Sequence, residues 1–461
     1  MLYSNEGIPP IMGDDTDMVG ECQIPIIFKS EETPGSSDGL RLLSLFSGCG
    51  GMDIGFEGGF IAPRKSFKPD CDWIEKSLDD DWVLLKKNIY TTVFANDILP
   101  EAQAGWEKYM SRFGDKSGVY HLASVVDLVK MHQKGVDVFP ENIDVVTGGF
   151  PCQDFSVAGK RKGFDSMKDH EGKSRASDVP TEESRGKLYY WMKQVIDITR
   201  PKVFIAENVK GMVSLGDVTE IIQRDFASAD GNGYIVLKPQ VLHAGNFGVP
   251  ESRERIIFIG IRMDALLPEA KKALEQTVVP EKYNPYPLVT HACTIKGYNL
   301  MPVVTTLDVL HGLPEPEEAI DPAQKIYSKA KFMGKGLQGQ TEIKLDTIGP
   351  TIRSEHHGNI EFRRLSKEHG GTHMEELERG LKERRLTPRE CAMIQTFPPD
   401  YQLILKKESG YGFLLSSSGA YKVVGNAVPP VLAYHIAKRL EKVWPLYFGE
   451  EYGSREQNNS N

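Results

Sequence analysis

A cysteine that follows a proline stands in the stretch 143–164 and could act as a nucleophile. The stretch opens with the run Ile-Asp-Val-Val-Thr, which is typical of a buried parallel strand, and two glycines follow. Pro151 then restricts the backbone that carries Cys152, and the basic triplet 160–162 makes the continuation cationic. This setting suits a thiolate that attacks next to a polyanion. A small cysteine buried at the end of a strand is the alternative.

Two other segments should bring charged groups to the same place. The apolar run 202–206 predicts a strand that ends at Glu207. Because parallel strands present their carboxyl ends to one edge of a sheet, we expect Glu207 near Cys152; a cap of the next helix is the alternative. Arg253 and Arg255 precede another apolar strand. Alternate residues of an extended segment point to one side, so both guanidinium groups should face the same way.

The first strongly apolar segment has the form of a nucleotide-binding turn. A predicted strand is followed by glycines at positions 48, 50 and 51 and then by a predicted helix. Their order differs from the Gly-x-Gly-x-x-Gly fingerprint, so a plain tight turn is equally compatible. The next predicted strand, 91–95, leads to Asp97 and Ile98. In doubly wound folds an acid there accepts hydrogen bonds from ribose hydroxyls; a cap of the helix predicted over 100–113 is the alternative.

These patterns predict an α/β fold with a doubly wound sheet and a second, smaller, irregular domain. Further strands are predicted near 120–126 and at 256–261, and helical spacing resumes at Leu188. Thr387, followed by Pro388 and Glu390, predicts a capped helix start. The strand–helix alternation stops after residue 262. We predict a flexible extension (1–39), a catalytic and cofactor-binding domain (40–262, completed by 420–446), the small domain (263–419) and a loose tail (447–461).

Composition restricts the class of protein. The 461 residues are 40% hydrophobic and 26% charged, as in soluble globular proteins of two or three domains. There is no run of about 18 apolar residues and no signal-peptide pattern at the start, so we expect a cytoplasmic protein without membrane contact. Six cysteines include no Cys-x-x-Cys pair, and the acid and histidines at 355–357 fit no zinc spacing, so we expect reduced thiols and no metal.

The net charge of -9 disfavours nucleic-acid binding through the overall field of the protein. Basic residues nevertheless cluster at 160–162, at Arg253 and Arg255, at 363–364 and at 382–389. These clusters predict either a basic cleft on an acidic body or separate solvated faces.

Taken in order, five motifs resemble those of the cytosine-5 DNA methyltransferase family. They are Phe46-Ser-Gly-Cys-Gly-Gly, Gly149-Phe-Pro-Cys-Gln, Glu207-Asn-Val, Arg253-x-Arg255 and Gly425-Asn-Ala-Val. The resemblance covers nearly all of the chain from Leu40 to Leu440 except 263–383. One motif could arise by chance, but five in the family's order are specific.

The resemblance implies S-adenosyl-L-methionine as cofactor, bound in the glycine-rich site. It places Phe46 and Ile98 against the adenine and Asp97 on the ribose. The other implied cofactor contacts are Ser47, Gly48, Gly50, Gly51, Pro151 and Asn426. The sequence departs from the family's usual residues at four positions: Asp97 for Glu, Ser124 for Asp, Glu251 for Gln and Ala427 for Ser. These departures concern the cofactor and loop details rather than the reaction.

By the same resemblance, Cys152 attacks C6 of a flipped-out cytosine, Glu207 contacts N3 and the exocyclic amine, and Arg255 supports the attack through O2. Arg253 is expected to hold a phosphate or the loop after Cys152. General chemistry agrees, because C5 is a poor nucleophile until a thiolate adds at C6. Glu207 must then carry or share a proton, which favours a raised pKa. Reaching C6 requires base flipping.

Three other classes share part of this pattern. A nicotinamide or flavin oxidoreductase would leave Cys152, Glu207 and the arginines without a common role, and a non-catalytic relative would not need all of them. A tRNA cytosine methyltransferase shares the motifs, but the long region 263–383 favours a reader of duplex DNA. The stretch 351–364 resembles restriction–modification enzymes that read GGWCC or GGNCC. We therefore expect a monomer that acts on double-stranded DNA at the nucleoid, with a restriction endonuclease as a functional, not physical, partner.

Overall fold

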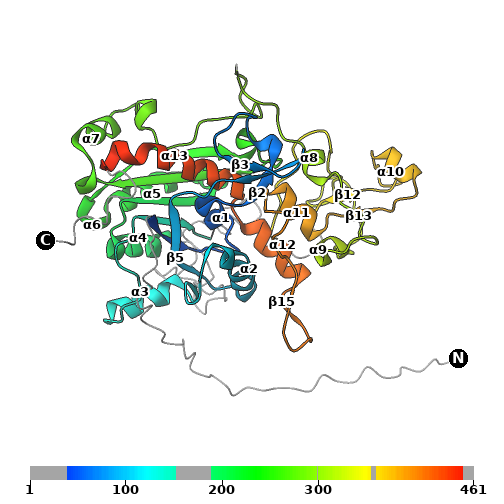
Figure 1. The fold of residues 1–461 in the computed structure, drawn as a ribbon, viewed down its shortest axis with the longest axis horizontal. Coiled ribbons are helices and arrows are strands. Elements are labelled where there is room, and N and C mark those ends of the chain that lie inside the picture. Colours follow the sequence, from blue (N-terminus) through cyan, green and yellow to red (C-terminus); the bar gives the residue numbers. More distant parts are fainter. Residues whose placement is uncertain (1–38, 152–187, 298, 355–359, 450–461) are drawn as a thin grey trace. The chain divides into compact units, whose positions relative to one another are not determined.

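The computed structural model describes residues 39–151, 188–297, 299–354 and 360–449. Its largest element is an eight-stranded sheet in the order β10-β11-β8-β7-β1-β5-β6, with β9 also paired to β11 (Figure 1). The strands are β1 (Leu40–Leu45), β5 (Tyr90–Asp97), β6 (Tyr120–Leu122), β7 (Val145–Gly149), β8 (Val203–Val209), β9 (Tyr234–Val236), β10 (Gln240–His243) and β11 (Glu254–Arg262). The five from β8 to β6 are parallel, whereas β11 is antiparallel to its neighbours.

Both faces of the sheet are buried because its strands are apolar at most positions, and successive side chains point to opposite faces. In β1, Leu40 and Leu42 pack into one core, and Leu43 and Leu45 pack into the other. The first core includes α1 (Gly51–Glu57), α2 (Pro100–Met110) and α13 (Pro430–Phe448); the second includes α3 (Val125–Gln133), α4 (Leu188–Thr199), α5 (Val218–Ala227) and α6 (Ala229–Asn232). Helices on both faces of a mostly parallel sheet confirm the predicted doubly wound α/β fold.

The strand order reverses at β1, which lies between β5 and β7. The chain first adds β5 and β6 on one side of β1 and later adds β7 and β8 on the other side. The carboxyl ends of β1 and β7 therefore border a crevice. The strands predicted at 91–95 and before Cys152, and the helices predicted from 100 and from 188, are confirmed. The strand predicted over 120–126 is shorter, because Ser124 caps α3 by accepting a hydrogen bond from the Val126 amide (3.3 Å).

The segment 61–85 contains several Trp and Asp residues and is an insert between α1 and β5. It forms a separate sheet of β2 (Ile61–Pro63), β4 (Trp82–Leu85) and β3 (Ile74–Ser77). Val83 and Leu85 are fully buried, and Trp73 packs edge-on against His435 of α13 (ring centroids 5.1 Å apart). The insert is thus anchored to the body by its apolar residues.

Between Met263 and α13 the chain forms short helices and two small, two-stranded antiparallel sheets. They are α7 (Pro268–Leu274), α8 (Thr306–Leu310), α9 (Pro322–Lys325), β12 (Phe362–Arg364), α10 (Met374–Glu378), β13 (Arg384–Arg385), α11 (Pro388–Ile394), β14 (Leu405–Lys406), β15 (Phe413–Leu415) and α12 (Ser417–Asn426). The helix start predicted at Thr387 is confirmed, with both hydrogen bonds of the Thr387–Glu390 capping box. Figure 1 shows α12 beside α2 and α11.

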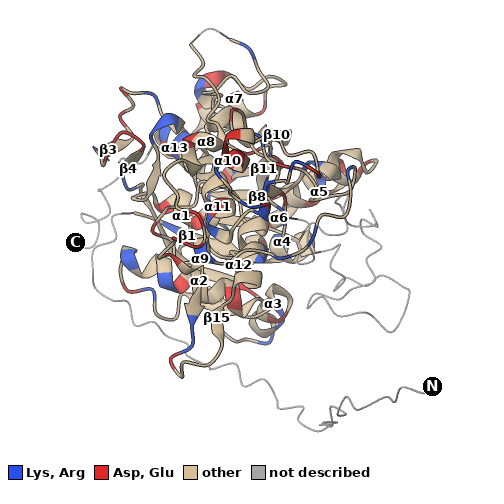
Figure 2. Cartoon of the chain, turned by 90° about the vertical axis from the view of Figure 1, so that its right-hand side faces the viewer, with Lys and Arg blue, Asp and Glu red and all other residues tan. Residues whose placement is uncertain are grey.

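The arginines of the predicted basic clusters at 363–364 and 382–389 are largely buried, so the expectation of a basic cleft or solvated faces is wrong for them. Arg364 is fully buried and Arg384 is 5% exposed. Arg384 pairs with Glu390 (2.9 Å) and Glu315 (2.9 Å), and Arg364 also pairs with Glu315 (3.1 Å). Such a network neutralises its own charges inside the protein. Elsewhere on the described elements acidic and basic residues are interspersed (Figure 2).

The closing helix α13 continues to Phe448. Tyr447 is fully buried, so the tail predicted from 447 begins after α13. The cause is an apolar face that continues through Trp444 and Tyr447 and packs into the first core. Within the described ranges, no helix combines the length and apolarity needed to cross a membrane.

We predict that His435 makes the protein less stable in acid. Its ring stacks on Phe67 (centroids 5.9 Å apart) and is buried, and burial lowers its pKa from 6.5 to about 3. Below pH 6.5 the unfolded chain therefore takes up a proton that the native state does not, and stability is lost as the pH falls. Between pH 6.5 and pH 5 the loss is about 2 kcal/mol.

His435→Phe keeps an aromatic ring in place and removes the titration. Urea unfolding at pH 7 and pH 5 should show a smaller loss of unfolding free energy in the variant than in the parent protein. The same loss in both proteins would contradict the assignment to His435.

Candidate active site

One cavity of about 1670 Å³ lies at the carboxyl ends of the central strands. Its lining joins residues that are far apart in the sequence: the turn after β1, the end of β5, the end of β7, β8 with the residues after it, the start of β11, the segments 336–341 and 350–354, and the end of α12. Every predicted site residue that the structure describes lines this cavity except Gly50. Cys152 and the basic triplet 160–162 lie outside the described residues.

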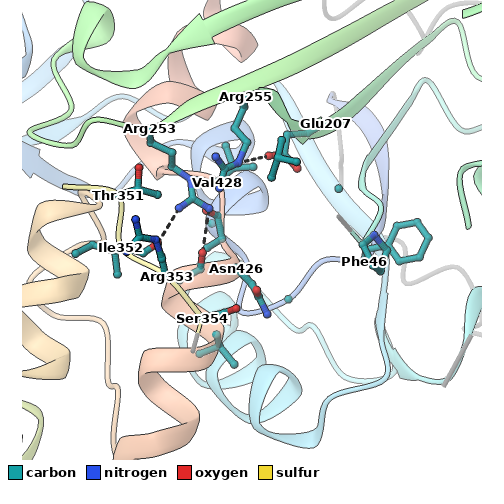
Figure 3. A pocket seen from close by; sticks show the side chains of 18 of the residues that line it. Phe46, Glu207, Arg253, Arg255, Thr351, Ile352, Arg353, Ser354, Asn426 and Val428 are labelled. Atoms are coloured by element: carbon teal, nitrogen blue, oxygen red, sulfur yellow. Dashed lines mark hydrogen bonds and ion pairs between the residues drawn. The ribbon is translucent and has the colours of Figure 1, made fainter. Parts of the chain in front are cut away.

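Glu207 and Arg255 form an ion pair inside the cavity (Figure 3). The Nε of Arg255 lies 2.8 Å from Oε1 of Glu207, and the two side chains are 12% and 10% exposed. Antiparallel pairing of β11 with β8 sets Ile257 opposite Glu207, so the pair spans two neighbouring strands. Burial raises the pKa of Glu207, and the positive charges of Arg255 and Arg253 oppose the rise. Glu207 lies within β8 rather than capping a helix.

The end of β7 is fitted closely around Glu207. Gly149 is paired with Glu207 in the sheet, and a Cβ atom at Gly149 would lie only 3.0 Å from Oε2 of Glu207. The side-chain amide of Asn208 donates to the carbonyl oxygen of Phe150 (3.1 Å), which fixes the peptide in front of Pro151. Pro151 lines the cavity and leads directly to Cys152. The strand pairing therefore brings the described end of this motif to the Glu207 carboxylate.

Arg253 occupies a different environment from Arg255. Its side chain is 1% exposed and donates hydrogen bonds to three backbone carbonyl groups. The acceptors are the oxygens of Ile352 (3.1 Å), Gly425 (3.0 Å) and Ala427 (2.7 Å). A guanidinium group buried in this way is not placed to bind a phosphate, so that part of the expectation is wrong. The loop after Cys152 lies outside the described residues, so a contact between Arg253 and that loop stays a prediction.

The turn after β1 is held in an unusual conformation. Phe46 has φ 53° and Gly48 has φ 55°, in the left-handed region that favours glycine. The side chain of Asn96 accepts from the Phe46 amide (3.3 Å), and its backbone oxygen accepts from the Ser47 amide (2.8 Å). A Cβ atom at Gly48 would meet nothing within 4 Å. The turn thus leaves open space beside Phe46, which a ligand can fill.

The other two glycines are required by packing. At Gly50 a Cβ atom would lie 2.9 Å from the ring of Trp106, and at Gly51 it would lie 2.3 Å from the carbonyl oxygen of Val428. Gly50 also has φ 87° and caps α1. These two positions therefore hold α1 against α2 and against the Gly425-Asn-Ala-Val motif.

Asp97 ends β5 at the cavity and binds the chain around it. One carboxylate oxygen accepts from the amides of Ile98 (2.7 Å) and Leu99 (3.1 Å), and the other accepts from the amide of Gly48 (3.1 Å). Burial raises its pKa, and these backbone hydrogen bonds oppose the rise. The N-cap of α2 is Leu99, so the alternative of Asp97 as the helix cap is wrong.

The end of α12 supplies the opposite side of this part of the cavity. Asn426 is exposed and lines the cavity, and Lys422, one turn earlier on the same face of the helix, also lines it. The positive charge of Lys422 acts against the rise in the Asp97 pKa. Lys422 was not singled out from the sequence; its spacing of four residues from Asn426 is the signal that could have found it.

Two further acids were missed in the sequence. Asp53 of α1 is fully buried, accepts from the Ser44 hydroxyl and the Trp106 indole (both 2.6 Å), and has its pKa raised by burial to about 6. Glu361 is 5% exposed, lines the cavity, and lies 3.4 Å from Arg353. No local pattern marks either acid, because their partners come from distant segments.

Arg353 is the basic residue of the segment 350–354, which lines the cavity. Its side chain is 36% exposed, and the Gln338 amide, with its oxygen turned toward the guanidinium, accepts from it at 2.8 and 3.2 Å. Among the described residues, no group of three or more His, Cys, Asp or Glu side chains is arranged to hold a metal ion.

Comparison with known proteins gives consistent matches. The model of the C-5 cytosine-specific DNA methylase family matches residues 40–442. The chain is 29% identical over 441 residues to the Type II methyltransferase M.BspRI of Lysinibacillus sphaericus, covering 92% of this chain and 86% of that protein. It is 29% identical over 426 residues to M.BsuRI of Bacillus subtilis, with 90% and 82% covered. The solved S. pombe Dnmt2 methyltransferase aligns with TM-score 0.49 at 17% identity, covering 88% of this chain and 99% of that one.

The family match begins at β1 and ends within α13, so it includes the whole sheet, the cavity and the segments 336–341 and 350–354 that line it. The chain therefore belongs to the C-5 cytosine-specific DNA methylase family and is a DNA cytosine-5 methyltransferase.

Proposed function

We propose that the protein transfers the methyl group of S-adenosyl-L-methionine to C5 of a cytosine flipped out of duplex DNA, through a covalent bond between Cys152 and C6. The observation that carries the proposal is the shared cavity: the Glu207–Arg255 pair and Pro151 line it together with Phe46 and Asp97. A base and a cofactor bound in one cavity can react without exposure to bulk water.

Three residues, Cys152, Glu207 and Arg255, each have a separate role in the reaction of the cytosine base. The Cys152 thiolate adds to C6, and the displaced electron pair makes C5 nucleophilic. Glu207 gives N3 a proton, or shares one with it, which its raised pKa favours. Arg255 stabilises the negative charge that develops at O2. C5 then takes the methyl group that the cofactor would supply. When the C5 proton and the added proton on N3 have been removed, the C5–C6 double bond forms again, the bond between sulfur and C6 breaks and the thiolate is restored.

The residues around the turn after β1 fit S-adenosyl-L-methionine, which supplies the methyl group when bound. The open space beside Phe46 and Gly48 accommodates an aromatic ring, and the Asp97 carboxylate can accept from ribose hydroxyls. Ile98 offers an apolar contact, and Ser47, Pro151 and Asn426 complete the lining. Gly50 and Gly51 would act indirectly, because their lack of side chains lets α1 pack where it does.

Duplex DNA is the favoured substrate because the region 263–419 contributes to the cavity. The cofactor residues come from the ends of β1 and β5, whereas Arg353 and the segment 336–341 come from the region 263–419 and supply groups that can read base edges. We infer that this region is the target-recognition domain and that 40–262 with 420–446 is the catalytic domain. Arg253 serves as a positioning residue between them.

Methyl transfer from radiolabelled S-adenosyl-L-methionine tests this proposal. Mixed-sequence duplex DNA should be labelled, and nuclease digestion should release the label as 5-methyl-2′-deoxycytidine. A tRNA pool is the parallel substrate. Label in tRNA and not in DNA would overturn the assignment of substrate.

The named relatives are Type II methyltransferases. We infer from them that this protein is the protective half of a restriction–modification system and acts as a monomer in the cytoplasm, at the nucleoid. Plasmid DNA methylated by the protein should resist an endonuclease that cuts the methylated site and remain sensitive to endonucleases of other specificity.

Cofactor binding should depend on the charge of Asp97. Asp97→Asn keeps the size of the side chain but removes the negative charge that accepts from ribose hydroxyls, so the Kd for S-adenosyl-L-methionine should rise about 10-fold or more. Titration calorimetry measures this change. Glu361→Gln, a buried carboxylate that lines the same cavity, is the control and should leave the Kd unchanged. Equal Kd values for Asp97→Asn and the parent would contradict the ribose contact.

A further inference from the structure

The backbone of one residue in the region 263–419, Ile352, is held on both sides by the charged side chains of Glu251 and Arg253. The amide of Ile352 donates to Oε1 of Glu251 (2.7 Å), and its carbonyl oxygen accepts from Nη1 of Arg253 (3.1 Å). Glu251 and Arg253 also pair with each other at 3.5 Å. Glu251, Arg253 and Ile352 are 0%, 1% and 2% exposed. The contacts form a closed, buried ring around the backbone of a single residue.

The same guanidinium group reaches a third segment. Its Nη2 donates to the carbonyl oxygens of Gly425 (3.0 Å) and Ala427 (2.7 Å), which flank Asn426. In Figure 3, Arg253 lies between Ile352 and the segment of Asn426. Arginine suits this place because its planar group carries several donors in a fixed geometry.

Backbone hydrogen bonds also join the segments that meet at this ring. The amide of Ser252 donates to the oxygen of Gly349 (2.8 Å), and the amide of Gly349 donates to the oxygen of Pro250 (2.9 Å). A Cβ atom at Gly425 would lie 2.2 Å from the carbonyl carbon of Arg353. The segments 250–253, 349–353 and 425–427 are therefore in direct contact, with no space for one to shift alone.

We call the contact between the segments 250–253, 349–353 and 425–427 the junction. It lies between Arg353 and Arg255, whose relative position must be fixed if a recognised base pair is to meet the catalytic groups. Arg353 is the residue after Ile352, and its side chain faces the cavity. Arg255 is two residues after Arg253 and pairs with Glu207. A displacement of the junction by one ångström would thus change where a recognised base pair lies relative to the catalytic groups.

We propose that Glu251 and Arg253 are positioning residues that couple target recognition by the segment 349–353 to catalysis at Glu207 and Arg255. The inference rests on the proposed function, because it takes Arg353 and its neighbours to contact DNA. Buried ion pairs contribute little net stability compared with apolar packing. A closed ionic ring at this place is better suited to fixing geometry.

The test compares Glu251→Ala and Glu251→Gln with the parent on plasmid DNA of mixed sequence. Bisulfite sequencing over a time course gives a methylation rate for every cytosine, so the target need not be known beforehand. The preferred site of the parent and all sites that differ from it by one base pair are then compared. The ratio of these rates measures discrimination.

Glu251→Ala removes the acceptor for the Ile352 amide, so the rate at the preferred site should fall about 10-fold or more and the ratio should shrink. Glu251→Gln should restore most of the ratio, because the amide oxygen can accept the same hydrogen bond. Glu376→Gln is the matched control: Glu376 pairs with Arg363 (2.6 Å) in the region 263–419 and does not line the cavity. It should leave the ratio unchanged, and thermal unfolding of each variant measures the purely structural effect.

Equal loss of rate at all sites in Glu251→Ala, with an unchanged ratio, would overturn the inference. If that variant does not fold, Arg253→Lys provides the second test, since one ammonium group cannot bond to Ile352, Gly425 and Ala427 in the same geometry. It too should shrink the ratio, and an unchanged ratio would again overturn the inference. Failure of the proposed function is separate: the parent protein would then methylate no cytosine in the plasmid.

Discussion

Cys152→Ser should abolish methyl transfer to DNA while cofactor binding is retained. A hydroxyl group at neutral pH is a much weaker nucleophile than a thiolate, so addition to C6 should fail. Loss of a covalent nucleophile lowers turnover on the order of 10⁴- to 10⁶-fold. Turnover with labelled cofactor measures the loss, and calorimetry with S-adenosyl-L-methionine should give the Kd of the parent, because the turn after β1 and Asp97 are unchanged.

The same substitution at another cysteine is the control. Cys293 is a partly buried free thiol that does not line the cavity, so Cys293→Ser should leave turnover within a factor of about two or three of the parent, as surface substitutions away from a site usually do. Turnover near the parent value in Cys152→Ser would remove the nucleophile from the mechanism.

Glu207→Gln should lower kcat by about 10²- to 10⁴-fold, the usual contribution of a positioned acid or base. The amide can still accept from Nε of Arg255, so the fold and the pair are largely preserved, but it cannot pass a proton to N3. Single-turnover methylation separates this step from DNA binding, whose Kd should change little. Glu254→Gln is the control, since Glu254 lines the same cavity and pairs with Lys210 (2.8 Å). A loss below about tenfold in Glu207→Gln would contradict the proton transfer.

The pH dependence provides a second readout for Glu207. Burial raises its pKa, so the protonated form persists to higher pH than in an ordinary glutamate. The part of the rate that requires the proton is fully present below that pKa and is lost as the pH rises through it. This descending limb should be present in the parent and absent in Glu207→Gln.

The sheet and its motifs could be predicted because each is encoded locally. Short apolar runs predict β1 and β7, and Thr387 with Glu390 predicts the start of α11. Since parallel strands end at one edge, placing Glu207 and Asp97 after two such strands also predicts that they face a common cavity. No local sequence pattern predicts that β11 pairs antiparallel with β8, yet this pairing places Arg255 beside Glu207.

The burial of the arginines could not be predicted, because their partners lie far away along the chain. Arg384 is 69 residues from Glu315, and Arg253 is 174 residues from Ala427. A local cluster of positive charge indicates a solvated or ligand-binding surface unless such partners are known. The same reason explains why Asp53 and Glu361 were missed. A buried charge is specified by tertiary packing, and the local sequence gives only its sign.

Covalent catalysis by Cys152 is tested most directly with duplex DNA of mixed sequence in which every cytosine carries fluorine at C5. With S-adenosyl-L-methionine present, the parent protein should form a DNA adduct that survives denaturation, because fluorine cannot leave C5 as a proton does. Peptide mass spectrometry should place the modification on Cys152. Efficient methylation of ordinary DNA without any adduct on the fluorinated DNA would contradict the covalent mechanism.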